Sequence, residues 1–147
     1  MPNFMIETTY RLPVYRQRRY EAPTLAEACR LAVEDDDWEG SKEDYESAGE
    51  THITGAWPGD VAPYSVPLLS IPSQFGETVQ RKADYFDELL EQLSLVAQPM
   101  GISRHDFERW IPHAQAAVCK ARAILAGAHD PEDGKADEDG GRVPTAA

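Results

Sequence analysis

Two apolar stripes at helical spacing, one on each side of Gly101, constrain the fold more than any other feature of this sequence. In both, apolar side chains recur at steps of three and four residues, which turns one face of a helix toward a single neighbour. The first stripe is Val79, Ala83, Phe86, Leu90, Leu93 and Ala97, and the second is Phe107, Ile111, Ala114, Val118, Ala121 and Leu125. The sequence therefore predicts two helices that pack against each other through these stripes.

The connection between the two helical runs is short and contains Pro99 and Gly101, residues that interrupt helices. Ser103 and Asp106 have the spacing of a capping box, which marks the start of the second helix. Because short connections join antiparallel neighbours, residues 78–127 are predicted to form an antiparallel helical hairpin.

Pro112 lies inside the second run. Within a helix it removes one hydrogen bond and clashes with the preceding turn, at a cost of about 3 kcal/mol. We therefore expect either a kink at Pro112 or a split into a short helix near 104–110 and a longer one from about 112.

The N-terminal part carries the signals of two strands, a helix and a third strand. Alternating side chains indicate strands over residues 4–10, 14–21 and 51–57, and a capping box of Thr24 and Glu27 starts a helix that ends near 34–36. The first two strands are predicted to pair as an antiparallel hairpin. The buried face of the helix is predicted to consist of Leu25, Cys29, Ala32 and Val33.

The expected fold class is therefore α+β, with a small antiparallel β-β-α-β unit over residues 1–58 packed against the helical hairpin. Residues 59–77 follow Pro58, contain three further closely spaced prolines and are predicted to be an extended connector. Residues 128–147 are acidic and almost free of apolar side chains, which predicts a disordered acidic tail.

The formal net charge of −12 over 147 residues disfavours direct binding to nucleic acid or to anionic membranes, because both need clustered cations. No apolar run approaches the ~20 residues of a membrane span, and no apolar leader precedes the first strand, so we expect a cytoplasmic protein. Cys29 and Cys119 lie far apart within helical patterns, which indicates buried free thiols rather than a disulfide.

Candidate binding residues come from an arginine-rich segment and from the acidic run after the first helix. They are Arg16, Arg18, Arg19, Asp35, Asp36, Asp37 and Trp38. The cations could form a site for phosphate, nucleic acid or an acidic partner, or they could pair with the protein's own acids. Strand alternation puts Arg16 and Arg18 on one face and Arg19 on the other, which favours internal pairing. The acids themselves could also hold a hard cation or a basic partner.

The sequence contains no motif for catalysis or for cofactor binding. There is no Gly-x-Ser-x-Gly elbow, no phosphate-binding glycine loop and no dinucleotide fingerprint. His105 and His113 are eight residues apart and the cysteines are unpaired, which is not the spacing of zinc ligands. The acidic run also lacks the glycine placement of a calcium loop. We therefore expect no cofactor and no metal, and favour a non-enzymatic role.

Three segments give the chain a family resemblance: residues 71–86 (IPSQFGETVQRKADYF), residues 44–51 (DYESAGET) followed by Gly55-Ala-Trp, and residues 123–127 (AILAG). In these segments it resembles small, acidic, uncharacterised bacterial proteins of the kind found on plasmids and other mobile elements. That resemblance implies no activity and supplies no catalytic residues.

Three functions are compatible with these features. The favoured one is a protein-interaction module that could form a homodimer, because the apolar stripes are wider than a two-helix seam needs. The second is an acidic mimic of DNA that inhibits a host defence or DNA-binding protein. The third is a small-molecule binder or enzyme with a pocket between sheet and hairpin, lined by Tyr10, Trp57 and Trp110.

Overall fold

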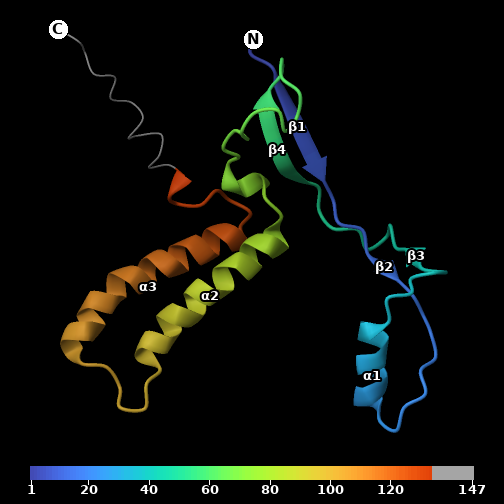
Figure 1. Cartoon of the computed structure of the whole chain (residues 1–147). Helices are drawn as coiled ribbons and strands as arrows, with labels where there is room; N and C mark the ends of the chain where they lie inside the picture. The colour runs from blue at the N-terminus through green and yellow to red at the C-terminus, as the bar shows by residue number, and fades with distance from the viewer. Residues whose placement is uncertain (134–147) are drawn as a thin grey trace. The chain divides into compact units, whose positions relative to one another are not determined.

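The computed structural model describes residues 1–133, and it has the predicted α+β class (Figure 1). Within residues 1–133, two small antiparallel sheets and three α-helices form two units. The outer unit combines Met1–Thr9 with the chain from Thr51 onward, and the inserted unit is Tyr10–Glu50. The residues predicted as one β-β-α-β unit, 1–58, are thus divided between the two.

The sheet of the outer unit pairs the two ends of that predicted segment. Strand β1 (Phe4–Thr9) runs antiparallel to β4 (His52–Pro58), with Met5 opposite Trp57 and an irregularity between Glu7 and Thr8. Both strands were predicted, but the predicted partner of the first was wrong. Of residues 14–21, only β2 (Val14–Tyr15) is a strand, and it pairs with β3 (Lys42–Glu43).

Trp57 is the core residue of the outer sheet, because its side chain is fully buried. The ring of Tyr64 lies edge-on to it at 4.8 Å, and Tyr64 holds a left-handed backbone with φ of 65°. The Tyr64 hydroxyl also donates to the Glu7 carboxylate at 2.8 Å, so it links the connector to β1. Farther along, Leu69 donates its amide to the Ala56 carbonyl at 2.9 Å, which attaches the connector to β4.

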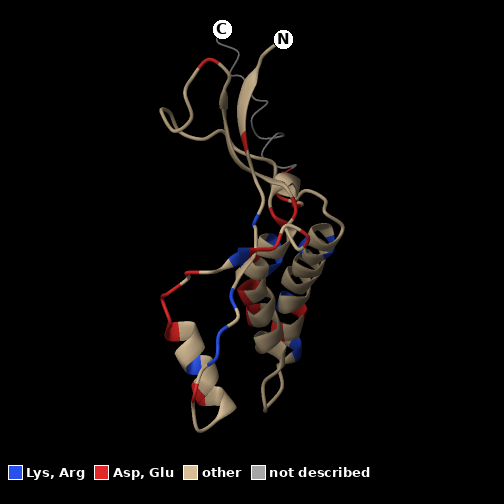
Figure 2. Cartoon of the chain, turned by 90° about the vertical axis from the view of Figure 1, so that its right-hand side faces the viewer, with Lys and Arg blue, Asp and Glu red and all other residues tan. Residues whose placement is uncertain are grey.

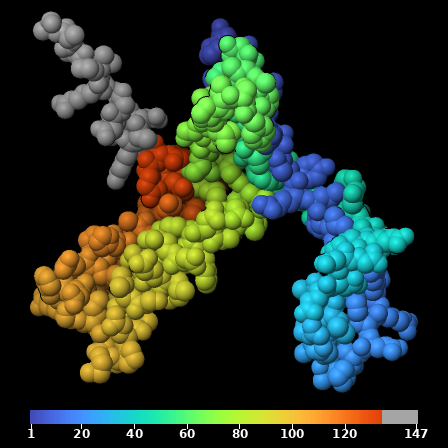
Figure 3. All heavy atoms as spheres, viewed as in Figure 1, coloured from blue at the N-terminus to red at the C-terminus, as the bar shows by residue number. Residues whose placement is uncertain are grey.

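The C-terminal helices form the predicted antiparallel hairpin (Figure 1). Helix α2 spans Thr78–Val96 and follows a short 3₁₀ turn, η1 (Ser73–Phe75); helix α3 spans Arg104–Leu125. Ser103 caps α3 as predicted, because its hydroxyl accepts from the Asp106 amide at 3.2 Å. The predicted split at Pro112 does not occur, since α3 continues through this residue. Figure 3 shows the two helices in contact along their length.

Residues 128–133 are held to the rest of the outer unit, contrary to the predicted disorder from residue 128. Asp130 forms an ion pair with Arg81 at 2.8 Å, and Asp133 accepts from the Ser73 hydroxyl at 2.5 Å. The sequence signal failed because these anchors are single polar contacts rather than apolar burial. Residues 134–147, which were predicted to belong to the same tail, lie outside the described residues.

The inserted unit contains one helix, α1 (Leu25–Glu34), beside the two-residue strands β2 and β3. Its predicted N-terminus is confirmed, because the Thr24 hydroxyl accepts from the Glu27 amide at 3.2 Å. Asp35 follows as the C-terminal cap residue, within the predicted range for the end of this helix.

The burial predicted for α1 and for the two cysteines is wrong. Leu25 is 81% exposed and Val33 is 85% exposed, and both Cys29 and Cys119 are exposed free thiols. The periodicity correctly marked an apolar stripe, but it could not show whether this protein itself covers that stripe. Within residues 1–133, none of the helices has the length and apolar character needed to span a membrane.

Candidate interaction surfaces

The two hairpin helices meet through a row of side chains that differs from the predicted stripes. The Tyr85 hydroxyl donates to the Ala117 carbonyl at 3.3 Å, and the Trp110 indole donates to the Gln92 carbonyl at 3.0 Å. Ala117 and Ile124 are the buried apolar residues of α3. Aromatic side chains with a polar tip can fill such a seam and bond to main-chain groups there. The helices thus pack as predicted, but through different residues.

Most of the predicted stripe residues are exposed instead, and Ile111, Ala114 and Ala121 are half-buried. Eight large side chains, 37% to 71% exposed, make up what we name the apolar face: Val79, Phe86, Leu89, Leu90, Leu93, Phe107, Val118 and Leu125. The prediction that the stripes pack against each other is therefore wrong. Tyr85 and Gln92 of α2 and Trp110 and Ala117 of α3 occupy the seam, so the apolar face stays outside it.

Both stripes lie on the same side of the hairpin. An α-helix turns by about 100° per residue. The exposed stripe of α2 therefore lies roughly a quarter turn around the helix from the seam residues Tyr85 and Gln92. The stripe of α3 is displaced in the same rotational sense from its own seam residues, Trp110 and Ala117. Because the helices are antiparallel, equal turns in that sense bring both stripes to one side. A hollow of about 500 Å³ beside the α3 stripe is lined by Trp110, Ile111, Ala114, Gln115, Val118, Cys119 and Arg122.

The opposite side of the hairpin is polar. A hollow of about 400 Å³ there is lined by Asp84 and Glu88 of α2 and by His113 and Lys120 of α3, among others. Lys120 lies 5.1 Å from the Tyr85 ring centre and 3.7 Å from the Glu132 carboxylate. Figure 2 shows the acidic and basic positions along the two helices. The hairpin therefore has one apolar and one charged side.

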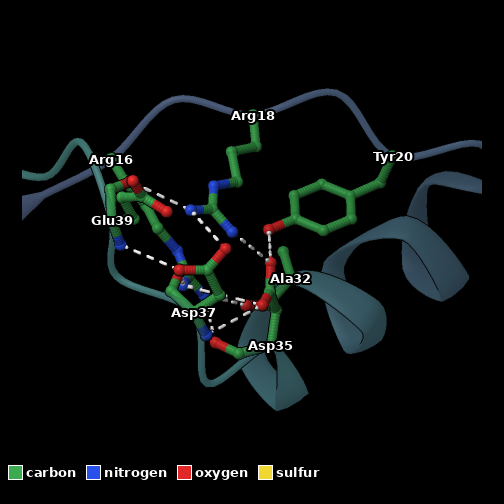
Figure 4. A network of polar contacts seen from close by, with 7 residues as sticks. All are labelled: Arg16, Arg18, Tyr20, Ala32, Asp35, Asp37 and Glu39. Atoms are coloured by element: carbon green, nitrogen blue, oxygen red, sulfur yellow. Dashed lines mark hydrogen bonds and ion pairs between the residues drawn. The ribbon is translucent and has the colours of Figure 1, made fainter.

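In the inserted unit, Arg16 closes the C-terminal end of α1 (Figure 4). Its guanidinium donates to the carbonyls of Ala32 at 2.9 Å and Asp35 at 2.5 Å, and also to that of Asp37. It also stacks over the Trp38 ring, 4.1 Å from the ring centre, and its side chain is only 9% exposed. The cation thus satisfies free carbonyls and offsets the acids that follow the helix.

Arg18 and Tyr20 bind the acids of the same turn (Figure 4). Arg18 forms ion pairs of 3.1 Å with Asp35 and with Asp37, and the Tyr20 hydroxyl donates to Asp35 at 2.7 Å. The Tyr20 hydroxyl is the largest influence on Asp35, followed by the Asp37 amide, and together with Arg18 they lower the Asp35 pKa to about 2. The amide of Glu39 is the main cause of a lowered Asp37 pKa.

Five of the seven candidate binding residues therefore converge: Arg16, Arg18, Asp35, Asp37 and Trp38. Arg19 and Asp36 take no part in this network as far as the described residues show. These contacts also explain why residues 16–20 do not continue β2: their side chains at alternate positions reach the end of α1 rather than a neighbouring strand. The cations and the acids pair with each other, and a role in binding an external partner stays a prediction.

Next to this network, α1 leaves a hollow of about 860 Å³ that sequence reasoning did not anticipate. It is lined on one side by Arg16, Arg18 and Trp38 and on the other by apolar residues of α1, including Leu25, Cys29 and Val33. The signal for it was present in the apolar stripe of α1, which we interpreted as a core-facing surface. The candidate residues thus border an exposed apolar groove within the inserted unit.

A partly buried polar cluster lies where β4, η1 and α2 meet in the outer unit. His52 and Glu77 approach to 3.5 Å, with side chains 9% and 11% exposed. Arg81, one turn farther along α2, contacts the Ala128 carbonyl at 2.7 Å in addition to Asp130. These contacts join the start of α2 to β4 and to the chain that follows α3.

No protein-family model, curated protein sequence or solved structure matches this chain.

Proposed function

We propose that this chain is a non-enzymatic protein-interaction module whose contact surface is the apolar face of the α2–α3 hairpin. The observation that carries the proposal is the exposure of eight large apolar side chains on one side of two packed helices. Monomeric proteins rarely leave such residues open as a contiguous patch, and larger patches mark interaction sites.

The small number of buried apolar residues supports the same proposal. Among residues 1–133, only Ala56, Trp57, Ala117 and Ile124 are buried hydrophobic residues. Burial of apolar surface is the main term that offsets the conformational entropy lost on folding. A chain with so little burial of its own gains stability from a partner that covers its open stripes.

Site-specific photo-cross-linking in the native host tests this proposal. A photoreactive phenylalanine at Phe86, in the apolar face, is expected to give a discrete cross-linked protein product. The matched control is the same residue at Leu95, which is also exposed but lies on the charged side of α2. Equal cross-linking from both positions, or none from either, contradicts the proposal.

A second candidate function, an acidic mimic of DNA, is favoured by one observation. Asp84, Asp87, Glu88 and Glu91 follow each other at helical spacing along the charged side of α2. A row of carboxylates on a rigid helix can imitate a row of phosphates. If this is the function, the chain will capture a nucleic-acid-binding protein that duplex DNA displaces, and neutralising these four acids to Asn or Gln will abolish the capture. Capture that DNA does not displace counts against it.

No observation favours a small-molecule pocket lined by Trp57 and Trp110. Trp57 is buried against Tyr64 in the sheet, whereas Trp110 lies in the hairpin seam and borders its hollows. The cytoplasmic location and the resemblance to plasmid-type proteins stay predictions from the sequence, and either is compatible with an interaction module.

A further inference from the structure

We propose that the occupant of the apolar face is a second copy of this chain, bound face to face as an antiparallel four-helix arrangement. This inference rests on the proposed interaction function and names its partner. A symmetric pair is the simplest solution for a self-complementary apolar surface, because the same patch then serves both copies.

The open area is close to what a stable dimer needs. The eight side chains of the apolar face are 37% to 71% exposed. At roughly 150 Å² for a fully open side chain of this size, they present on the order of 650 Å² of apolar surface. Specific interfaces bury about 800 Å² on each partner, which is of the same order as this open area.

The charges around the face decide between the two possible symmetric arrangements. Lys82 lies within the apolar arc of α2, and the last turn of α2 contains no basic residue. With a two-fold axis perpendicular to the helices, Lys82 lies over the C-terminal turn of the other copy's α2, where carbonyls are free and the helix dipole is negative.

An axis parallel to the helices would instead stack α2 on α3 at the same level. Since Tyr85 lies opposite Ala117 in the hairpin, Lys82 would then approach the other copy's Arg122. That contact between like charges is unfavourable, so the perpendicular axis is the arrangement that we infer. In this arrangement Leu90, near the middle of the α2 stripe, lies close to Leu90 of the other copy. Leu125, at the end of α3, lies far from Leu125 of the other copy.

Light scattering on the full chain tests the partner. The expected mass is twice 16.3 kDa at micromolar concentration. Leu93→Glu, at a side chain 61% exposed, is expected to weaken the dimer by about 100-fold, because it places a carboxylate in each half of the apolar interface. Leu95→Glu, at a side chain 44% exposed on the charged side of the same helix, should leave the mass unchanged.

A constant mass of 16.3 kDa from nanomolar to submillimolar concentration overturns the dimer. So does equal weakening by Leu93→Glu and Leu95→Glu. The cross-linking at Phe86 separates this failure from that of the proposed function. A monomer that cross-links to another protein keeps the interaction module and removes the second copy, and a monomer without any product removes both.

Cysteine pairing tests the arrangement, starting from a chain with Cys29→Ser and Cys119→Ser. Under mild oxidation, Leu90→Cys is expected to form an intermolecular disulfide, and Leu125→Cys is expected to stay reduced. Both residues are more than half exposed, so accessibility does not distinguish them. A disulfide through Leu125→Cys, with none through Leu90→Cys, overturns the perpendicular axis.

Discussion

The indole nitrogen of Trp110 donates a hydrogen bond to the main-chain carbonyl of Gln92, at 3.0 Å, across the two helices of the hairpin. With Tyr85 and Ala117 it fixes the antiparallel register of α2 and α3. Trp110→Phe removes the donor together with the five-membered part of the indole, so we expect a loss of at least about 1 kcal/mol in unfolding free energy. Denaturant unfolding at fixed protein concentration measures it. Tyr85→Phe, which removes a longer bond, should lose less, and the reverse order would contradict the described seam.

Arg16→Lys is expected to destabilise the inserted unit although it preserves the charge. A single ammonium cannot reach the carbonyls of Ala32, Asp35 and Asp37 together, nor can it stack flat on Trp38. The loss should be about 2 kcal/mol, with faster hydrogen exchange in the last turn of α1. Arg19→Lys, a neighbouring candidate outside the network, provides the control. Equal exchange rates in both variants would show that Arg16 does not close the helix.

The carboxyl of Asp35 should titrate with a pKa of about 2, measurable from its carbon chemical shift. An unfolded Asp titrates near 3.9. Because the folded value is depressed, the stabilisation is complete above about pH 4 and is lost as pH falls toward 2. Tyr20→Phe removes the largest cause and should raise the Asp35 pKa, whereas Tyr15→Phe should leave it unchanged. A raised value in both variants would assign the effect to something other than the Tyr20 hydroxyl.

Gly55 is required in β4 because the ring of Trp57 covers its Cα. A Cβ at this position would lie 2.3 Å from one ring atom of Trp57 and 2.7 Å from another. Gly55→Ala must therefore displace the fully buried indole, and we expect a loss of about 2–3 kcal/mol with a shift in tryptophan fluorescence. Gly49→Ala, where a Cβ would meet only ordinary contacts of 3.5 Å or more, is the matched control. A neutral Gly55→Ala would mean that Trp57 does not pack over this strand.

The sequence was sufficient for features that depend on neighbours in the chain. The start of α1 at Thr24, the cap of α3 at Ser103 and the periodic runs of the hairpin were all predicted correctly. Strand pairing was not, because β1 and β4 are joined across more than forty residues and no local signal specifies that partner. Residues 14–21 alternate like a strand, but their polar side chains are used at the end of α1 instead.

The candidate site illustrates the same limit. Composition showed that Arg16, Arg18 and the acids could pair, and alternation correctly separated Arg19. The hydrogen bonds from the Arg16 guanidinium to the carbonyls at the end of α1 could not be predicted. A side chain that binds main-chain acceptors leaves no pattern in the sequence. In the hairpin, periodicity located the apolar face but could not show whether the protein covers it itself. That distinction depends on which row of side chains fills the seam.

Residues 128–133 should contribute measurably to the stability of the outer unit. A chain ending at residue 127 loses the Ala128 carbonyl and the Asp130 carboxylate, which bind Arg81 at 2.7 and 2.8 Å, and the Asp133 partner of Ser73. The Arg81 side chain is only 10% exposed, so the truncation removes two acceptors of a largely buried cation. We expect the unfolding free energy to fall by about 2–3 kcal/mol relative to a chain ending at residue 133. Asp130→Asn in the longer chain should reproduce part of that loss, because it keeps the shape of the side chain and removes its charge. Equal stability of the two truncated chains would show that these contacts do not anchor the end of α3.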